Sequence, residues 1–179
     1  MRAKRGSLAA GLLTAILLLT PMSAAWALSS DYWWVLPLRG ANAEEIFGAA
    51  VSGAGDVNGD GYADVIVGAP SKTLAGPAGG RAFLYLGGAG FDTIPALTMD
   101  PGPPSFGSAV SGAGDVNGDG YADWIVGAPG AGDGLAYLYF GGSAPDAVPD
   151  VMLTGPASDS EFGFSVAALA TSTTTATTT

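Results

Sequence analysis

Short apolar runs separated by Gly-rich and polar turns make up most of the chain, and nothing after residue 27 has the pattern of a helix. In the first unit of this pattern we expect strands near 48–54, 64–69, 81–86 and 96–99. Apolar and polar residues alternate only weakly within these runs, which is typical of strands that are covered on both faces. The pattern therefore predicts an all-β protein.

The same pattern occurs twice, because residues 47–70 and 106–129 are nearly identical. Their sequences, FGAAVSGAGDVNGDGYADVIVGAP and FGSAVSGAGDVNGDGYADWIVGAP, differ at two of 24 positions. A third copy starts at Phe162 with FGFSVAAL, so the successive starts are 59 and 56 residues apart. A repeat of this period predicts units that cannot bury their apolar faces without a neighbour.

Each copy carries a loop in which alternate residues supply oxygen atoms. The candidate ligands of the first loop occupy positions 1, 3, 5, 7 and 9, and they are Asp56, Asn58, Asp60, Tyr62 through its backbone carbonyl, and Asp64. The second loop has the same set, namely Asp115, Asn117, Asp119, Tyr121 through its carbonyl, and Asp123. Several anionic oxygen ligands in one tight loop suit Ca²⁺, so we expect about two Ca²⁺ ions per chain. Position 6 is glycine in both loops, where the sharp turn favours a positive φ.

The flanks of these loops distinguish them from an EF-hand. Each loop begins as an EF-hand loop does, but position 12 holds Val67 or Val126 where an EF-hand has glutamate. The runs on either side have the composition of strands. The sequence therefore predicts a calcium loop that joins two strands. The alternative is a turn that binds nothing, because Asp, Asn and Gly favour turns in any case.

A Phe-Gly pair and a Gly-Ala-Pro triplet bracket each loop, at 47–48 and 68–70 and again at 106–107 and 127–129. This arrangement resembles the FG-GAP repeat of the integrin α-chain N-terminal β-propeller and its secreted bacterial relatives, over about residues 31–169. The resemblance implies four-stranded blades, about seven of which close a ring, with a Ca²⁺ loop between the first two strands of a blade. It also implies the ligand sets given above. Because this chain has two repeats and the start of a third, we expect a partial β-propeller of about two and a half blades.

On this interpretation the repeats define the domain boundaries. Residues 28–46 form the leading strand of an incomplete blade, 47–105 and 106–161 form two FG-GAP blades, and 162–169 begin a third repeat. The leading segment contains DYWWVLPLRG, which precedes the first Phe-Gly pair as ALTMDPG precedes the second. Its aromatic residues could instead form a ligand-binding patch.

The N-terminus has the three parts of a signal peptide. Basic residues at positions 2, 4 and 5 precede an apolar run at 8–19, and Ala25-Trp26-Ala27 forms an A-x-A cleavage site. The apolar run is shorter than the roughly 20 residues that a spanning helix needs. We therefore expect residues 1–27 to be a signal peptide, with an uncleaved anchor as the alternative. The mature protein would be secreted, periplasmic or on the cell surface, with no membrane span.

Charge and composition exclude several classes of function. Cleavage removes three of the six basic residues and none of the 16 acidic ones, which leaves a net charge of −13. Such a chain lacks the basic surface that binds nucleic acid. It has no cysteine and no histidine, so it contains no disulfide, no Ser-His pair and no Cys-His pair. We therefore do not expect an enzyme.

Two functions remain at the level of sequence. The first is a calcium-binding propeller fragment that acts as an extracellular binding or cell-adhesion module for a protein or a glycan. The alternative is the non-catalytic propeller portion of a larger secreted hydrolase, such as a phospholipase-like enzyme. Two blades alone would leave two apolar faces uncovered. We therefore expect either a marginal, calcium-dependent fold or self-association through the open blade faces.

The Thr-rich tail ATSTTTATTT, at 170–179, begins where a third metal loop would begin. It could be an export linker or a segment without function. A third interpretation is a frameshift. A GC-rich coding of GDVNDDGYDDV, read with its first nucleotide deleted, translates as all ten residues of the tail. We favour the frameshift, under which this chain lacks the third loop.

Overall fold

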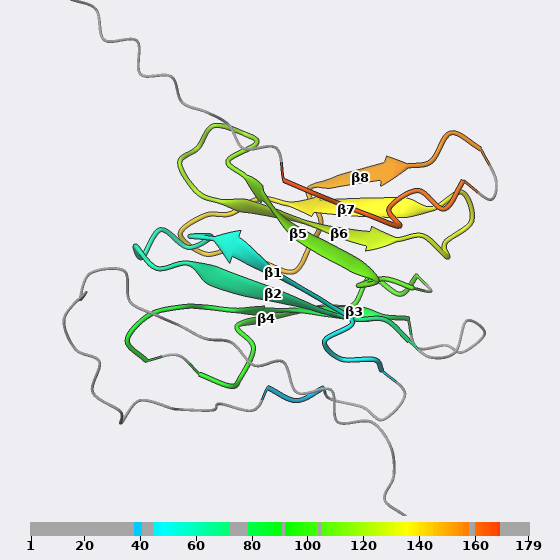
Figure 1. Ribbon diagram of the computed structural model, residues 1–179. Helices are drawn as coiled ribbons and strands as arrows, with labels where there is room; N and C mark the ends of the chain where they lie inside the picture. The colour runs from blue at the N-terminus through cyan, green and yellow to red at the C-terminus, as the bar shows by residue number, and fades with distance from the viewer. Residues whose placement is uncertain are drawn as a thin grey trace, which may run out of the picture.

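The described part of the protein is built from two four-stranded antiparallel sheets. The computed structural model describes residues 38–40, 45–71, 79–90, 92–103, 105–157 and 160–168. Their strands, labelled in Figure 1, are β1 Ala50–Gly55, β2 Asp64–Ala69, β3 Arg81–Tyr85, β4 Leu97–Met99, β5 Ala109–Gly114, β6 Asp123–Ala128, β7 Leu135–Tyr139 and β8 Val151–Thr154. The sheet orders are β1-β2-β3-β4, called the first blade below, and β5-β6-β7-β8, the second blade.

These strands confirm the all-β prediction, and in the first blade their ends lie within two residues of the predicted ones. The described residues include no helix, and therefore none that could cross a membrane. The signal peptide and the Thr-rich tail lie outside the described residues.

Two shorter predictions have a mixed outcome. Of the leading strand, only residues 38–40 and 45–46 are described, and the former are not in a strand. Leu38 is buried all the same, in a cluster with Phe47 and Phe83. At the start of the third repeat, residues 162–168 form no strand, but Phe162 makes a parallel bridge to Gly134 of the second blade. The described residues of both segments therefore contact the blades without extending the sheets.

The central strands are buried on both faces, as their weak alternation predicted. Every residue of β2 is buried, and in β6 only Ile125 is partly exposed. In β2, Val65 and Val67 pack in a cluster with Phe47, whereas Ile66 belongs to the cluster that joins the two blades. A strand covered on both sides has no need for polar positions, which explains the continuous apolar run.

The two blades stack through unlike faces. The second blade contributes Trp124, Val126 and Phe106 to the shared core, and the first blade contributes residues such as Ile66 and Met99. Trp124 is fully buried, and its ring stacks on Tyr139 with centroids 5.5 Å apart. Its Nε1–H donates to the sulfur of Met99 at 3.2 Å. Figure 1 shows the blades one above the other, with the first strands β1 and β5 packed together.

Glycines of the repeated motifs set the spacing between the blades. A Cβ added to Gly68 of the first blade would lie 2.0 Å from the carbonyl oxygen of Gly107, in the Phe-Gly pair that begins the second repeat. The equivalent Gly127 stands in the same relation to Gly163 of the third repeat, at 1.9 Å. The backbone of the second and third Phe-Gly pairs therefore packs directly against the glycine of the Gly-Ala-Pro triplet in the preceding repeat. The third Phe-Gly pair is seated on the second blade as the second pair is on the first.

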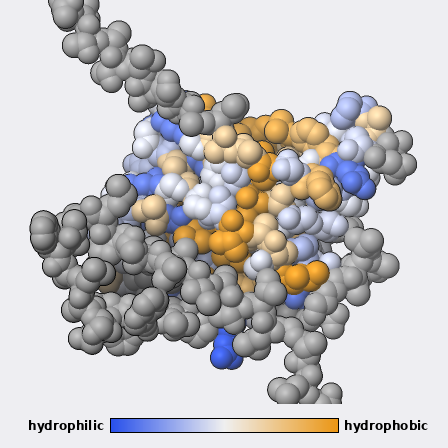
Figure 2. Space-filling model, in the orientation of Figure 1, coloured by the Kyte–Doolittle hydropathy of each residue, from blue (hydrophilic) through white to orange (hydrophobic). Residues whose placement is uncertain are grey.

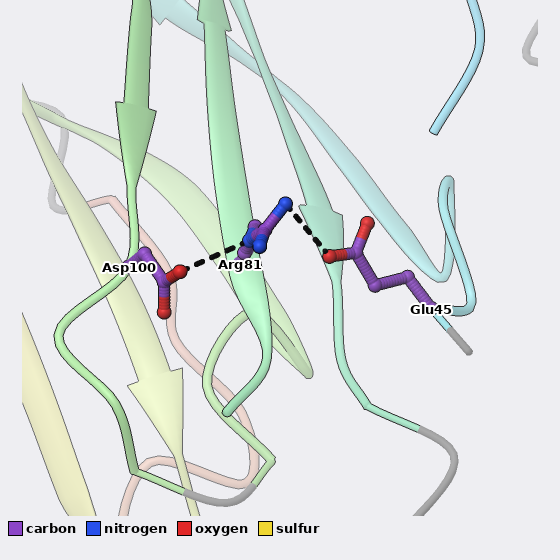
Figure 3. Close-up of polar contacts among 3 residues, drawn as sticks. All are labelled: Glu45, Arg81 and Asp100. Carbon is purple, nitrogen blue, oxygen red and sulfur yellow. Dashed lines mark hydrogen bonds and ion pairs between the residues drawn. The ribbon is translucent and has the colours of Figure 1, made fainter. Parts of the chain in front are cut away.

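An ion-pair cluster connects the segment that precedes β1 to strand β3 of the first blade (Figure 3). Arg81, the first residue of β3, lies between Glu45 and Asp100, with nitrogen–oxygen distances of 3.2 and 3.1 Å. The Glu45 side chain is only 5% exposed. In the second blade, the equivalent of Arg81 is Leu135, so this cluster belongs to the first blade alone.

The outermost strand of the second blade leaves apolar side chains in solvent. Met152 and Leu153 of β8 are 59% and 41% exposed. Figure 2 shows a hydrophobic region along the upper edge of the molecule, where Figure 1 places β8. Self-association through such a face remains a prediction.

Candidate metal centre

The two Asp-rich loops lie at equivalent places, between the first and second strands of each blade. Residues 56–63 connect β1 to β2, and residues 115–122 connect β5 to β6. Gly61 and Gly120, at position 6, have φ values of 88° and 93°, as the sequence predicted. This backbone conformation strains any residue with a Cβ, so the glycines allow the loop to fold back on itself.

The aspartate at position 1 organises the backbone of each loop. In the first loop, Asp56 accepts N–H hydrogen bonds from Gly59 and Asp60 on Oδ1, at 2.8 and 3.0 Å, and from Gly61 on Oδ2, at 2.8 Å. Asp115 accepts the equivalent three bonds in the second loop, at 2.7, 3.0 and 2.9 Å. One carboxylate therefore holds three successive N–H groups and closes the turn.

The next two candidate ligands form a second set of local bonds. The side chain of Asn58 accepts from the Asp60 N–H at 3.1 Å and donates to Oδ2 of Asp60 at 2.9 Å. Oδ1 of Asp60 accepts the N–H of Tyr62 at 2.9 Å. The second loop repeats each bond, between Asn117, Asp119 and Tyr121, to within 0.1 Å. The two loops therefore share one conformation as well as one sequence.

The aspartate at position 9 differs from the others because it is buried. Asp64 is 1% exposed, and it accepts the N–H of Val57 on Oδ2 at 2.8 Å and the N–H of Gly87 on Oδ1 at 2.7 Å. Burial raises the pKa of the Asp64 carboxyl. The hydrogen bonds from Gly87 and Val57 oppose this rise, and the charges of Asp60 and Asp56 add to it. The side chain therefore connects the loop to the turn that follows the third strand.

Asp123 occupies the same place in the second blade. It is fully buried and accepts the N–H of Val116 at 2.6 Å and that of Gly141 at 2.8 Å. Sequence reasoning identified Asp64 and Asp123 as ligands and missed this anchoring role. An available signal was their position directly before the buried runs VIV and WIV, where an ionised residue needs buried partners.

The structure thus brings the predicted ligands of each copy into one loop. In the described residues, however, no three acidic side chains surround a common point as they would around an ion. Ligation by these side chains, and by the carbonyls of Tyr62 and Tyr121, remains a prediction.

Comparison with known families adds a second line of observation. The profile of the FG-GAP repeat family matches residues 47–85 and 106–139. The chain contains two FG-GAP repeats. Each matched segment begins at a Phe-Gly pair, includes the Asp-rich loop and ends with the third strand of a blade. In the close approach of Gly68 to Gly107, the Gly-Ala-Pro triplet of one FG-GAP repeat therefore contacts the Phe-Gly pair of the next.

Several curated relatives of these FG-GAP repeats are integrin alpha chains. The chain is 37% identical to integrin alpha-6 of Gallus gallus over 117 residues, which are 63% of this chain and 11% of that protein. It is 40% identical to integrin alpha-PS3 of Drosophila melanogaster over 106 residues, covering 58% and 9%. Identity to integrin alpha-IIb of Mus musculus is 40% over 101 residues, covering 54% and 10%. The chain thus spans about a tenth of the length of these relatives.

Proposed function

We propose that this chain is part of a secreted or cell-surface β-propeller whose FG-GAP loops bind Ca²⁺. The propeller would serve as a binding or cell-adhesion module for an extracellular protein or glycan. The observation that carries the proposal is the Asp-rich loop itself, which has the same donor set and the same hydrogen bonds in both blades.

The donor set suits a calcium ion. All the candidate side chains in a loop offer oxygen, and three of them are carboxylates. A carboxylate has about four acceptor positions. Asp56 uses three of these on backbone N–H groups, and Asp60 and Asp64 use two each, so each retains a lone pair for an ion. Bound Ca²⁺ would offset the mutual repulsion of these carboxylates and hold the loop closed.

The relatives favour a binding module over a propeller attached to a secreted hydrolase, because those named above are integrin alpha chains. The proposal accordingly assigns no catalytic residue. A self-associating form remains compatible with it, since the apolar residues of β8 are exposed.

Calcium binding is the first test. Calorimetry should find about two Ca²⁺ per chain and much weaker binding of Mg²⁺, which demands a tighter octahedral geometry. Asp60→Ala combined with Asp119→Ala should abolish binding, and chelation should lower the melting temperature of the unsubstituted protein.

The matched control removes two exposed aspartates from outside the loops, as Asp92→Ala with Asp146→Ala. It changes the net charge equally and should leave the stoichiometry at two. Unchanged binding in the loop variant, or equal losses in both variants, would refute calcium ligation by these loops.

Export is tested separately. The basic, apolar and A-x-A segments at the N-terminus motivate it. Mass spectrometry of the exported protein should place the new N-terminus at Leu28. Recovery of the intact N-terminus from the membrane fraction would support an uncleaved anchor instead.

A further inference from the structure

The two Asp-rich loops are almost identical in sequence but lie in different surroundings. Val57, at position 2 of the first loop, is fully buried, whereas its counterpart Val116 is 55% exposed. The tyrosine at position 7 shows the opposite difference between the loops, because Tyr62 is 52% exposed and Tyr121 is partly buried. These differences have one cause, which is that the second blade covers the first loop.

The covering contacts come from two segments of the second blade. The N–H of Ala122 donates to the carbonyl oxygen of Asp56 at 3.0 Å, and the N–H of Gly142 donates to that of Val57 at 2.9 Å. Both acceptors are backbone atoms of the first loop, at positions 1 and 2. The second blade therefore fixes the peptide groups that carry the first candidate ligand.

Side chains reinforce this contact. The ring of Tyr121 lies so close to Gly59 that a Cβ added to the glycine would be 2.6 Å from Cε1. Val57 belongs to the core cluster that also contains Trp124 and Tyr139 of the second blade. By contrast, Val116 is exposed among the described residues, and a Cβ added to Gly118, the counterpart of Gly59, would meet no atom within 4 Å.

We infer that the second blade positions the first loop, so that cation binding there is coupled to the docking of the two blades. The inference rests on the proposed calcium function and deepens it. A loop already held by its neighbour loses less conformational entropy when it closes around an ion, so the first loop binds Ca²⁺ more tightly than the second. Coupling of this kind is reciprocal, and an ion in the first loop therefore strengthens blade docking. Val57 acts as a positioning residue and not as a ligand.

The test measures the two sites one at a time. Asp119→Ala leaves only the first site, and Asp60→Ala leaves only the second. Calorimetry should give a Ca²⁺ affinity on the order of tenfold higher for the Asp119→Ala protein than for the Asp60→Ala protein, within the usual range of coupling between sites. Adding Val57→Ala to the Asp119→Ala protein should reduce this difference in affinity. Val116→Ala added to the Asp60→Ala protein is the matched control and should change nothing. Equal affinities that Val57→Ala does not alter would overturn the inference.

Amide hydrogen exchange in the presence of chelator gives a second readout that requires neither metal nor substitution. The N–H groups of Gly59 and Asp60 should exchange at least several-fold more slowly than those of Gly118 and Asp119, because opening the first loop also breaks contacts with the second blade. Equal exchange in the two loops would overturn the inference even if Val57→Ala failed to fold. Absence of calcium binding at both sites, with unequal exchange, would instead refute the proposed metal function and leave the positioning by the second blade established.

Discussion

Gly68→Ala is expected to separate the two blades and to lower the free energy of unfolding by about 3 kcal/mol or more, at or above the upper end of the usual cost of overpacking. The new methyl group would lie 2.0 Å from the carbonyl oxygen of Gly107 and 3.0 Å from its carbonyl carbon. Both obstacles are backbone atoms, which cannot rotate away as the end of a flexible side chain can. Urea unfolding followed by circular dichroism measures the loss.

The chain offers a matched control in the neighbouring strand. Gly53 of β1 also pairs with β2, but a Cβ added there would meet no atom within 4 Å. Gly53→Ala should therefore cost no stability, since it also reduces the freedom of the unfolded chain. A Gly68→Ala protein as stable as Gly53→Ala would show that the close approach of Gly68 to Gly107 does not set the blade spacing.

Asp64→Ala is expected to destabilise the protein strongly even when no metal is present. The substitution leaves the N–H groups of Val57 and Gly87 without their acceptor. Hydrogen bonds to charged groups contribute about 1.5–3 kcal/mol each. The relief of a buried charge offsets part of this, so we expect a net loss on the order of 3 kcal/mol. Asp123→Ala should behave in the same way, and thermal unfolding in chelator measures both.

Asp60→Ala is the control for this prediction. Asp60 is exposed, and its side chain bonds only within its own loop. In chelator the exposed donors that lose Asp60 can bond to water instead, so the substitution should cost less than about 1 kcal/mol, as exposed substitutions usually do. Asp64 and Asp60 would then differ in what they contribute to the stability of the metal-free protein, although both are needed to bind Ca²⁺. Equal stability of the Asp64→Ala and Asp60→Ala proteins in chelator would contradict the anchoring role.

The fold followed closely from the sequence because local and repeated signals agreed. The run DVIVGA carries β-branched residues without polar interruptions, and it forms β2 with the predicted ends. Position 6 of the loop required a glycine, and Gly61 has the expected positive φ. Such features depend on a few neighbouring residues, and the near-identical second copy confirmed each of them.

Contacts between the blades could not be predicted in the same way. Val57 and Val116 occur in the same sequence, DVNGDG, yet one is buried and the other exposed. The Gly-Gly pair at 141–142 has the composition of an ordinary turn, yet the N–H of Gly142 donates to the loop of the preceding blade. These properties depend on which unit stands next to which, and a local pattern contains no information about its neighbours.

The stacking of the blades also determines the symmetry that these repeats can generate. The second blade contacts the first through the face that contains Trp124. The first blade contacts the second through the face that contains Ile66, which is the non-equivalent face of the repeat. A contact between unlike surfaces is heterologous, so it is not satisfied by pairing two equal units as a twofold interface would be. Repeating the same rotation from blade to blade produces either a closed ring or an open helix. Phe162 and Gly163 lie against the second blade as the Phe-Gly pair of the second repeat lies against the first blade, so they already follow the same rotation.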